Sequence, residues 1–337
     1  MRHLATIKRI DSIRPIEGAD AIDCAVIGGW VTVIKKGEYQ PGDLAVYCEI
    51  DSWIPHAFAP FLSQGKEPRE YMGIKGERLR TVKLRGQVSQ GLLLPMSVLT
   101  NYGADLCEGA DVTETLGIVK YEPPVPAQLA GEVEGAFPSF IPKTDQERIQ
   151  NLVREYETWK GFGYTWEETE KLDGTSLTVF RSAECPIGVC SRNWEVRETE
   201  GNTLWAMARQ YDLENVLSKL GNFAIQGEVI GPGIQKNKYG LSKHEFHVYD
   251  IFDIDAQQYL PPAKRMAIVK EHGLLHVPVI ASDRSFTGMS VEDALAHVVN
   301  KSLIGTKPER EGSVFKCNQE PVSFKIISNR FLLKNNE

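Results

Sequence analysis

One stretch of the sequence combines a lysine with the residue types of a tight turn. Residues Lys171–Gly174 read KLDG and are followed by strand-forming residues up to Phe180. Asp-Gly is a favoured hairpin dipeptide, so Lys171 can be the solvated flank of a hairpin. A lysine amine is also a nucleophile once its pKa is lowered. Four residues do not separate these two interpretations, and the rest of the chain must decide between them.

Two further charged residues lie in segments that alternate like half-buried strands. In FAIQGEVIG (223–231), a period of two places Glu228 on the face opposite the larger apolar side chains. In VSFKIIS (322–328), the same period places Lys325 opposite the apolar residues. Two strands that each direct one charge away from the core predict a shared polar cleft.

Six stretches with polar residues follow one another in a fixed order. After KLDG come SRN at 191–193, GEVIG at 227–231, FHVYDIF at 246–252, EGSVFK at 311–316 and SFKIIS at 323–328. They resemble motifs I, Ia, III, IIIa, IV and V of the covalent nucleotidyltransferases, the superfamily of ATP-dependent DNA and RNA ligases and mRNA capping enzymes. The resemblance covers residues 135–335. It is closest to ATP-dependent RNA ligases with an N-terminal OB domain, which PKTDQERIQN (142–151) also resembles.

Two features favour the RNA ligases within this superfamily. DNA ligases and capping enzymes carry an OB domain after motif V, whereas only about ten residues follow Ser328 here. Capping enzymes usually place an arginine two residues after the motif I glycine, where this chain has Thr175-Ser176. We therefore expect an RNA ligase.

Motif V departs from the pattern of these ligases. It often contains two lysines one residue apart, and the second position here is Ile327. Either Lys325 acts alone, or Lys316 or Lys334 supplies the missing charge.

The resemblance assigns a role to one residue or more in each motif. It implies that Lys171 is the catalytic nucleophile. It also implies that Arg192 holds the ribose or a phosphate, that Tyr249 stacks on adenine, and that Glu228 binds a ribose hydroxyl or organises a metal ion. The complete implied sets are nucleotide binding by Arg192, Glu228, Tyr249, Lys316, Lys325 and Arg148, and metal binding by Asp173, Glu311 and Glu228. Each has a structural alternative, such as an exposed strand charge, a surface turn or a half-buried strand aromatic.

The implied chemistry requires a neutral lysine. An ordinary lysine has a pKa of about 10.4 and is protonated at neutral pH. We expect Lys325, Lys316 and a bound Mg²⁺ or Mn²⁺ to lower the pKa of Lys171, and Asp173 to raise it. Lys171 would attack the α-phosphate of ATP to form lysyl-AMP. AMP would pass to a 5′-phosphate end of RNA, and a 3′-hydroxyl would displace it.

The turn pattern predicts two domains. Short strands between residues 4 and about 118 suit a small barrel, and a Pro-rich stretch follows. Helical patterns begin at Thr144, which can cap a helix over 143–161, and at 202–221. We predict an all-β OB-like barrel followed by an α+β nucleotidyltransferase (ATP-grasp-like ligase) domain with antiparallel sheets. The predicted boundaries are 1–120 for the OB domain, 121–140 for the linker and 141–337 for the adenylyltransferase domain.

A basic stretch marks the predicted barrel. KGERLRTVKLR (75–85) carries five cations and one acidic residue, and alternation places Arg78 and Arg80 on one strand face. OB folds bind nucleic acid through such faces, so we predict RNA binding by Arg78, Arg80, Lys83 and Arg85. No aromatic residues interleave with these charges, so a solvated strand of a stable barrel is the alternative.

Composition excludes several classes of protein. The chain has 337 residues, 42% of them hydrophobic and 25% charged, with a net charge of −7, as in ordinary globular proteins. No apolar run approaches the roughly 20 residues of a membrane span, and the N-terminus lacks a signal-peptide core. The six cysteines form no C-x-x-C pair. We expect a cytoplasmic monomer that contacts no membrane.

Three functions remain in order of preference. The first is ATP-dependent sealing of RNA with 3′-OH and 5′-phosphate ends, including nicks in a duplex, in RNA repair. The second keeps the chemistry but acts on nicked DNA. The third is a nucleic-acid-binding protein whose catalytic domain has degenerated, which the altered motif V permits.

Overall fold

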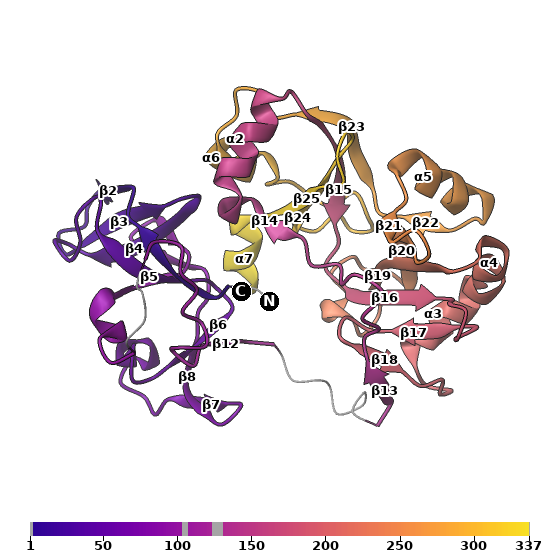
Figure 1. The fold of residues 1–337 in the computed structure, drawn as a ribbon, viewed down its shortest axis with the longest axis horizontal. Coiled ribbons are helices and arrows are strands. Elements are labelled where there is room, and N and C mark those ends of the chain that lie inside the picture. Colours follow the sequence, from indigo (N-terminus) through magenta and orange to yellow (C-terminus); the bar gives the residue numbers. More distant parts are fainter. Residues whose placement is uncertain (1–2, 103–106, 123–130, 337) are drawn as a thin grey trace. The chain divides into compact units, whose positions relative to one another are not determined.

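The chain folds into two compact units, which the computed structural model describes for residues 3–102, 107–122 and 131–336 (Figure 1). One unit comprises Met1–Pro124, Gln150–Val153 and Asn329–Glu337, as far as these are described. The other comprises Val125–Ile149 and Arg154–Ser328 under the same limit. A short internal segment and the C-terminal helix therefore belong with the N-terminal unit rather than with the residues that flank them.

The N-terminal unit is built from short antiparallel strands. Within the described residues they form the sheets β1-β5-β11, β2-β3-β4, β10-β9 and β12-β6-β8-β7. Its elements are β1 (Ala5–Arg9), β2 (Ser12–Pro15), β3 (Ile22–Ile27), β4 (Trp30–Lys35), β5 (Leu44–Cys48), β6 (Ser52–Pro55), η1 (Pro60–Ser63), β7 (Arg69–Tyr71), β8 (Ile74–Arg78), β9 (Val82–Leu84), β10 (Gln87–Ser89), β11 (Leu92–Pro95), η2 (Met96–Leu99), β12 (Val119–Lys120) and α7 (Asn329–Asn335).

The core of this unit lies between its sheets. Ile7 of β1, Val46 of β5, Ile54 of β6 and Leu94 of β11 are buried in one apolar cluster. The internal segment is tied to the barrel through Asn151. Its Oδ1 accepts a hydrogen bond from Trp30 Nε1 at 2.6 Å, and its Nδ2 donates to Glu49 Oε1 at 2.7 Å.

The second unit contains two larger sheets, an eight-stranded and a five-stranded one among the described residues. Their orders are β13-β18-β17-β16-β19-β20-β21, with β22 on β20, and β14-β25-β24-β15-β23. All pairings are antiparallel except β14 with β25 and β20 with β22.

The bounds of the elements in and around these sheets follow the chain. They are β13 (Val133–Ala136), β14 (Glu147–Arg148), η3 (Ile149–Asn151), α2 (Val153–Gly161), β15 (Thr165–Lys171), β16 (Thr175–Phe180), β17 (Gly188–Cys190), β18 (Trp194–Val196), α3 (Thr203–Gln210), α4 (Leu213–Leu220), β19 (Phe223–Ile230), η4 (Gln235–Asn237), β20 (Glu245–Asp253), β21 (Gln258–Tyr259), α5 (Pro262–Glu271), β22 (Leu275–His276), β23 (Val279–Ser285), α6 (Val291–His297), β24 (Gly312–Cys317) and β25 (Ser323–Ile327).

Each sheet has its own core. On the eight-stranded sheet, Leu177 and Ile225 pack with Leu204 of α3, Leu217 of α4 and Val269 of α5. The five-stranded sheet has an aromatic core, in which the ring of Phe324 lies 4.8 Å from Trp166, 5.1 Å from Phe315 and 6.4 Å from Tyr156 of α2. The polar faces of both sheets are left for other contacts.

The KLDG stretch is the crossing between the two sheets, so its interpretation as a hairpin is wrong. β15 ends at Lys171 and pairs with β23 and β24, whereas β16 begins at Thr175 and pairs with β17 and β19. A side chain at Gly174 would overlap the carbonyl oxygen of Val229. Only glycine permits this close approach of the crossing segment to β19.

Two helix predictions also need correction. The helix expected from Thr144 begins only at Val153, because the preceding residues are extended and Glu147–Arg148 pairs in parallel with β25. The helix expected over 202–221 is two helices, α3 and α4, separated at Asp212, whose φ of 50° interrupts a right-handed helix. Across the described residues, no helix combines the length and apolar character needed to span a membrane.

Candidate active site

Lys171 lies among carboxylates at the crossing between the sheets. It stands opposite Gly312 across β15 and β24, and its Nζ donates a hydrogen bond to Glu311 Oε1 at 2.7 Å. Burial lowers the pKa of Lys171, but the carboxylates of Glu311, Glu228 and Asp173 outweigh this effect and raise the pKa above its ordinary value. Lys171 is therefore an ammonium group in this state.

Two of these carboxyl groups lie in an unfavourable environment for a negative charge. Burial raises the pKa of Glu228 to about 8, although its Oε1 accepts a hydrogen bond from the Gly174 N–H at 3.0 Å. Burial also raises the pKa of Glu311. Glu311 Oε2 is buried and has no hydrogen-bond partner among the described residues. Such a group requires an additional positive charge or donor.

A strained turn holds the third carboxylate. Asp173 forms an ion pair with Lys238, and its backbone N–H donates to the Tyr239 hydroxyl at 2.8 Å. Both partners follow η4, whose three residues have φ of 44°, 57° and 48°. Consecutive left-handed residues other than glycine are energetically unfavourable and cluster at functional sites. The side chain of Gln235 in this turn reaches the Gly174 carbonyl oxygen at 3.4 Å.

The predicted three-carboxylate metal site needs correction. Within the described ranges, no group of three or more His, Cys, Asp or Glu side chains is arranged to hold a metal ion. The physical reason is visible for two of the three, since ammonium groups of Lys171 and Lys238 lie against Glu311 and Asp173. The unpartnered Glu311 Oε2 and the raised pKa of Glu228 nevertheless fit a cation that also takes ligands from a substrate.

Lys325 and Arg192 converge on one carboxylate, that of Asp145. Lys325 Nζ lies 2.8 Å from Asp145 Oδ1, and Arg192 Nη2 lies 2.9 Å from Asp145 Oδ2. Burial lowers the pKa of Lys325 to about 8 against the opposing effect of Asp145, and Arg148 and Lys171 lower it further. Asp145 thus connects a strand of the five-stranded sheet with the turn between β17 and β18. The polar cleft predicted from Glu228 and Lys325 is confirmed, because the charges of both act on Lys171 or Glu311.

Tyr249 is fixed by its hydroxyl group. The hydroxyl donates to Thr144 Oγ1 at 2.9 Å and lies 3.3 Å from Ser176 Oγ, and burial raises its pKa. The ring is therefore held on the same face of the sheet as Ser176 and Glu228, which lie opposite each other on β16 and β19.

Lys316 is not the neighbour of Lys171 that the sequence suggested. Its Nζ donates to the Tyr249 carbonyl oxygen at 2.6 Å and to Asp250 Oδ1 at 2.7 Å, and burial lowers its pKa. Lys316 joins β24 to β20 and supports Tyr249 from behind. The position of the second motif V lysine is filled by Ile327, which is 6% exposed and lies opposite Gly312. Lys334 lies on α7, in the other unit.

The predicted RNA-binding residues differ in their surroundings. β8 ends at Arg78, so Arg80 lies beyond the strand and the two do not alternate on it as expected. Arg78 forms an ion pair with Asp51 at 2.6 Å. Lys83 on β9 and Arg85 at the turn between β9 and β10 are exposed.

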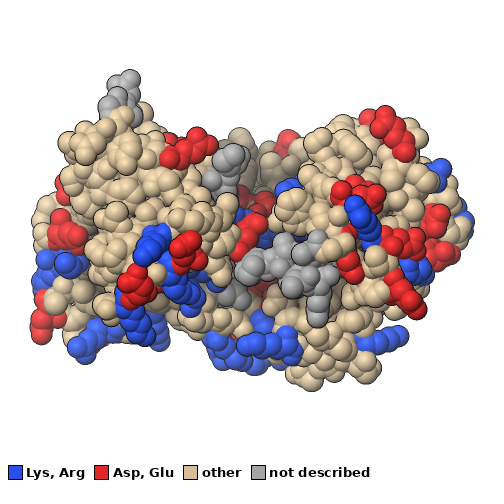
Figure 2. All heavy atoms as spheres, turned by 90° about the horizontal axis from the view of Figure 1, so that it is seen from below, with Lys and Arg blue, Asp and Glu red and all other residues tan. Residues whose placement is uncertain are grey.

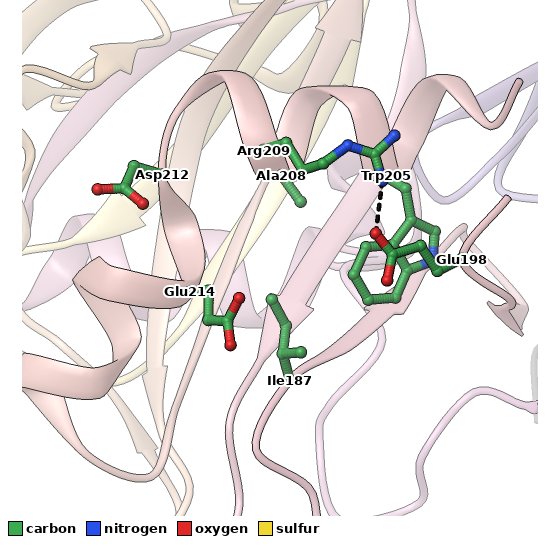
Figure 3. A pocket seen from close by; sticks show the side chains of 7 residues that line it. All are labelled: Ile187, Glu198, Trp205, Ala208, Arg209, Asp212 and Glu214. Carbon is green, nitrogen blue, oxygen red and sulfur yellow. Dashed lines mark hydrogen bonds and ion pairs between the residues drawn. The ribbon is translucent and has the colours of Figure 1, made fainter. Parts of the chain in front are cut away.

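A separate pocket on the second unit contains none of the predicted residues. It has a volume of about 340 Å³ and lies along α3 and the start of α4, beside Trp205 (Figure 3). Arg209 at its edge is ion-paired with Glu198 at 2.6 Å. The pocket lacks the convergent charges found around Lys171, and we assign it no role.

Sequence patterns missed four residues of the site. Asp145 and Thr144 lie in a segment that reads as a helix start, and Lys238 and Tyr239 follow a turn that only the backbone reveals. A signal existed for the first pair, because PKTDQERIQN carried part of the family resemblance. We found none for the second pair.

Comparisons with known proteins cover both units. A family model described as an OB-fold domain matches residues 4–96, and a family model described as RNA ligase matches residues 164–334. No curated protein matches the chain.

Solved structures of an RNA ligase from Naegleria gruberi are similar over the whole chain. An apo structure of a variant is 45% identical, covers 99% of this chain and 98% of its own, and has a TM-score of 0.92. A variant with AMP and Mn is 46% identical, with 98% of both chains covered and a TM-score of 0.91. A structure with PPi is 46% identical, covers 100% of this chain and 99% of its own, and has a TM-score of 0.91. The predicted fold class, an OB-like barrel followed by a nucleotidyltransferase domain, is confirmed.

Proposed function

Because the chain belongs to the RNA ligase family, we propose that it is an ATP-dependent enzyme that joins 3′-OH and 5′-phosphate ends of RNA through lysyl-AMP. The observation that carries the proposal is the position of Lys171, at a crossing between two sheets and among the carboxylates of Glu311, Glu228 and Asp173. The similar ligase with ATP and Mn, or AMP and Mn, supports ATP and a divalent metal ion as cofactors here.

The first step would form a phosphorus–nitrogen bond. The ammonium group of Lys171 loses a proton, and Glu311, 2.7 Å away, is placed to accept it. Nζ then attacks the α-phosphorus of ATP, the bond from that phosphorus to the bridging oxygen breaks, and pyrophosphate leaves. A divalent cation held by Glu311 and Asp173 together with the phosphates would neutralise negative charge, which favours the neutral amine. Lys325 would contact the α-phosphate.

The next two steps would use the same site. The 5′-phosphate of RNA attacks the phosphorus of lysyl-AMP, which frees Lys171 and forms a phosphoanhydride. The 3′-hydroxyl then attacks the 5′-phosphate, and AMP leaves as the strand is closed. Tyr249, held by Thr144 and Ser176, would stack on adenine, and Glu228 would bind a ribose hydroxyl. Arg192, and Arg148 beside Lys325 on β14, would contact phosphates.

The pH dependence of lysine adenylylation should depend on Asp145. Lys325 needs its positive charge to contact a phosphate, and its pKa of about 8 already places the loss of that charge near neutral pH. Asp145→Asn removes the group that raises this pKa, so the decline in rate at alkaline pH should begin at lower pH. The measurement is the rate of covalent labelling between about pH 6.5 and 9. Parallel profiles for the variant and the wild type would show that Asp145 has no such effect.

The sugar at the 3′-OH end separates RNA sealing from DNA sealing. We expect wild-type protein to seal a nicked duplex ending in a ribonucleotide at least tenfold faster than one ending in a deoxyribonucleotide, since a 2′-hydroxyl is what distinguishes the two. Equal rates would favour the DNA ligase alternative. Failure to label the protein from ATP after removal of bound AMP with pyrophosphate would contradict the enzymatic proposal.

A further inference from the structure

The sheet β12-β6-β8-β7 carries an arginine–aromatic face that the sequence does not suggest. Trp53, Tyr71, Tyr121, Arg69 and Arg78 make up this face, and they come from or directly follow four strands. The sequence shows no aromatic residue within the basic stretch, and the fold supplies three. Figure 2, seen from below Figure 1, shows Lys and Arg side chains gathered with acidic ones on the N-terminal unit.

The rings and guanidinium groups are layered. Trp53 and Tyr121 are stacked at 5.8 Å with 20° between their planes, and Tyr71 lies 5.0 Å from Tyr121. Arg78 lies over Tyr121 at 4.9 Å, and Arg69 lies over Trp53 at 5.7 Å. Trp53 is buried at 2% exposure, whereas Tyr71 and Tyr121 are half-buried and keep accessible ring surface. Trp53 is therefore the support, and the tyrosines form the accessible layer.

The same region lacks an anion. Arg80 Nε is buried and has no hydrogen-bond partner among the described residues. Burial and the nearby charges of Arg78 and Arg69 lower the pKa of Arg80. Arg78 and Arg69 are each paired with a carboxylate, Asp51 at 2.6 Å and Glu77 at 2.5 Å, so the unsatisfied donor belongs to Arg80. A buried guanidinium group with an unused N–H is well suited to bind a phosphate oxygen.

We propose that this face binds a nucleotide of the RNA strand, with its base on Tyr71 and Tyr121 and its phosphate on Arg80. The inference rests on the proposed function and specifies how the N-terminal unit binds RNA. Aromatic rings beside arginine side chains bind single-stranded nucleic acid because every base offers a face for stacking and every linkage offers an anion. A peptide would supply only one of these two features at a nucleotide's spacing.

The test compares RNA binding with ATP labelling in the same variants. For Tyr71→Ala/Tyr121→Ala we expect the dissociation constant for a nicked RNA duplex to rise at least tenfold, because stacking on aromatic residues contributes about 1–3 kcal/mol per base. Labelling from ATP should stay within twofold of wild type. Phe61→Ala, which removes an aromatic residue with 62% exposure from η1, is the matched control and should leave both unchanged.

A second variant leaves the aromatic rings intact. Arg80→Gln should weaken RNA binding and reduce the slope of log K against log salt by about one, as expected for one lost phosphate contact. Tyr71→Leu/Tyr121→Leu replaces the alanine pair if that pair fails to fold. If the wild type seals RNA but the tyrosine and Arg80 variants bind RNA as it does, this inference is wrong and the proposed function stands. If the wild type neither labels nor seals, the proposed function fails first.

Discussion

Lys171→Ala protein is expected to retain no label after incubation with α-phosphate-labelled ATP and Mn²⁺, whereas wild-type protein stays labelled through a denaturing gel. The covalent bond needs a nitrogen at the crossing between the sheets, and alanine supplies none. Glu311 would still be present to bind a cation, so loss of label would report the missing nucleophile. We expect the sealing rate to fall by at least a thousandfold, as is usual when a covalent nucleophile is removed.

The control for this result is another lysine of the same unit. Lys243 is exposed near the start of β20, and Lys243→Ala should be labelled as efficiently as the wild type. Both proteins must first be treated with pyrophosphate, which reverses adenylylation and frees any lysine already carrying AMP. Label on Lys171→Ala at the wild-type level would show that another residue is the nucleophile.

The sequence predicted the parts of the site that depend on local pattern. Glu228 and Lys325 were placed correctly because each lies on a strand with one apolar face, where a period of two determines the direction of a side chain. Phe324 and Ile326 are fully buried, as the alternation around Lys325 requires. The fold class and the family followed from the order of the motifs, which the comparisons confirm.

The remaining contacts depend on residues far apart in the chain. Asp145 lies next to Lys325 although 180 residues separate them, and no local pattern distinguishes its carboxylate from that of a helix start. Tertiary pairing of β14 with β25 overrides the helical pattern that begins at Thr144. The layered rings of Trp53 and Tyr121 are likewise brought together by sheet pairing.

A buried charge network joins the two sheets behind Tyr249. Arg265 of α5 is 1% exposed, forms an ion pair with Glu167 of β15, and lies 3.7 Å from Asp250 of β20. Lys316 of β24 also contacts Asp250, at 2.7 Å. Both sheets must keep a fixed separation if Lys171 and Glu311 on one side and Glu228 and Tyr249 on the other are to act on one nucleotide. The network provides a direct connection between them.

Removing the central cation should therefore be severe. Arg265→Met leaves Glu167 and Asp250 buried without their guanidinium partner, and we expect the free energy of unfolding to fall by about 3–5 kcal/mol, measured by urea unfolding. Arg209→Met breaks the exposed pair with Glu198 and should cost at most about 1 kcal/mol.

Adding Glu167→Gln to Arg265→Met tests the cause of the loss. The second change removes one of the uncompensated charges, so part of the lost stability should return if unpaired buried charge is responsible. Equal unfolding free energies for Arg265→Met and Arg209→Met would mean that water reaches Glu167 and Asp250 once the guanidinium group is gone. The connection between the sheets would then depend on packing, and the position of Tyr249 relative to Lys171 would not require Arg265.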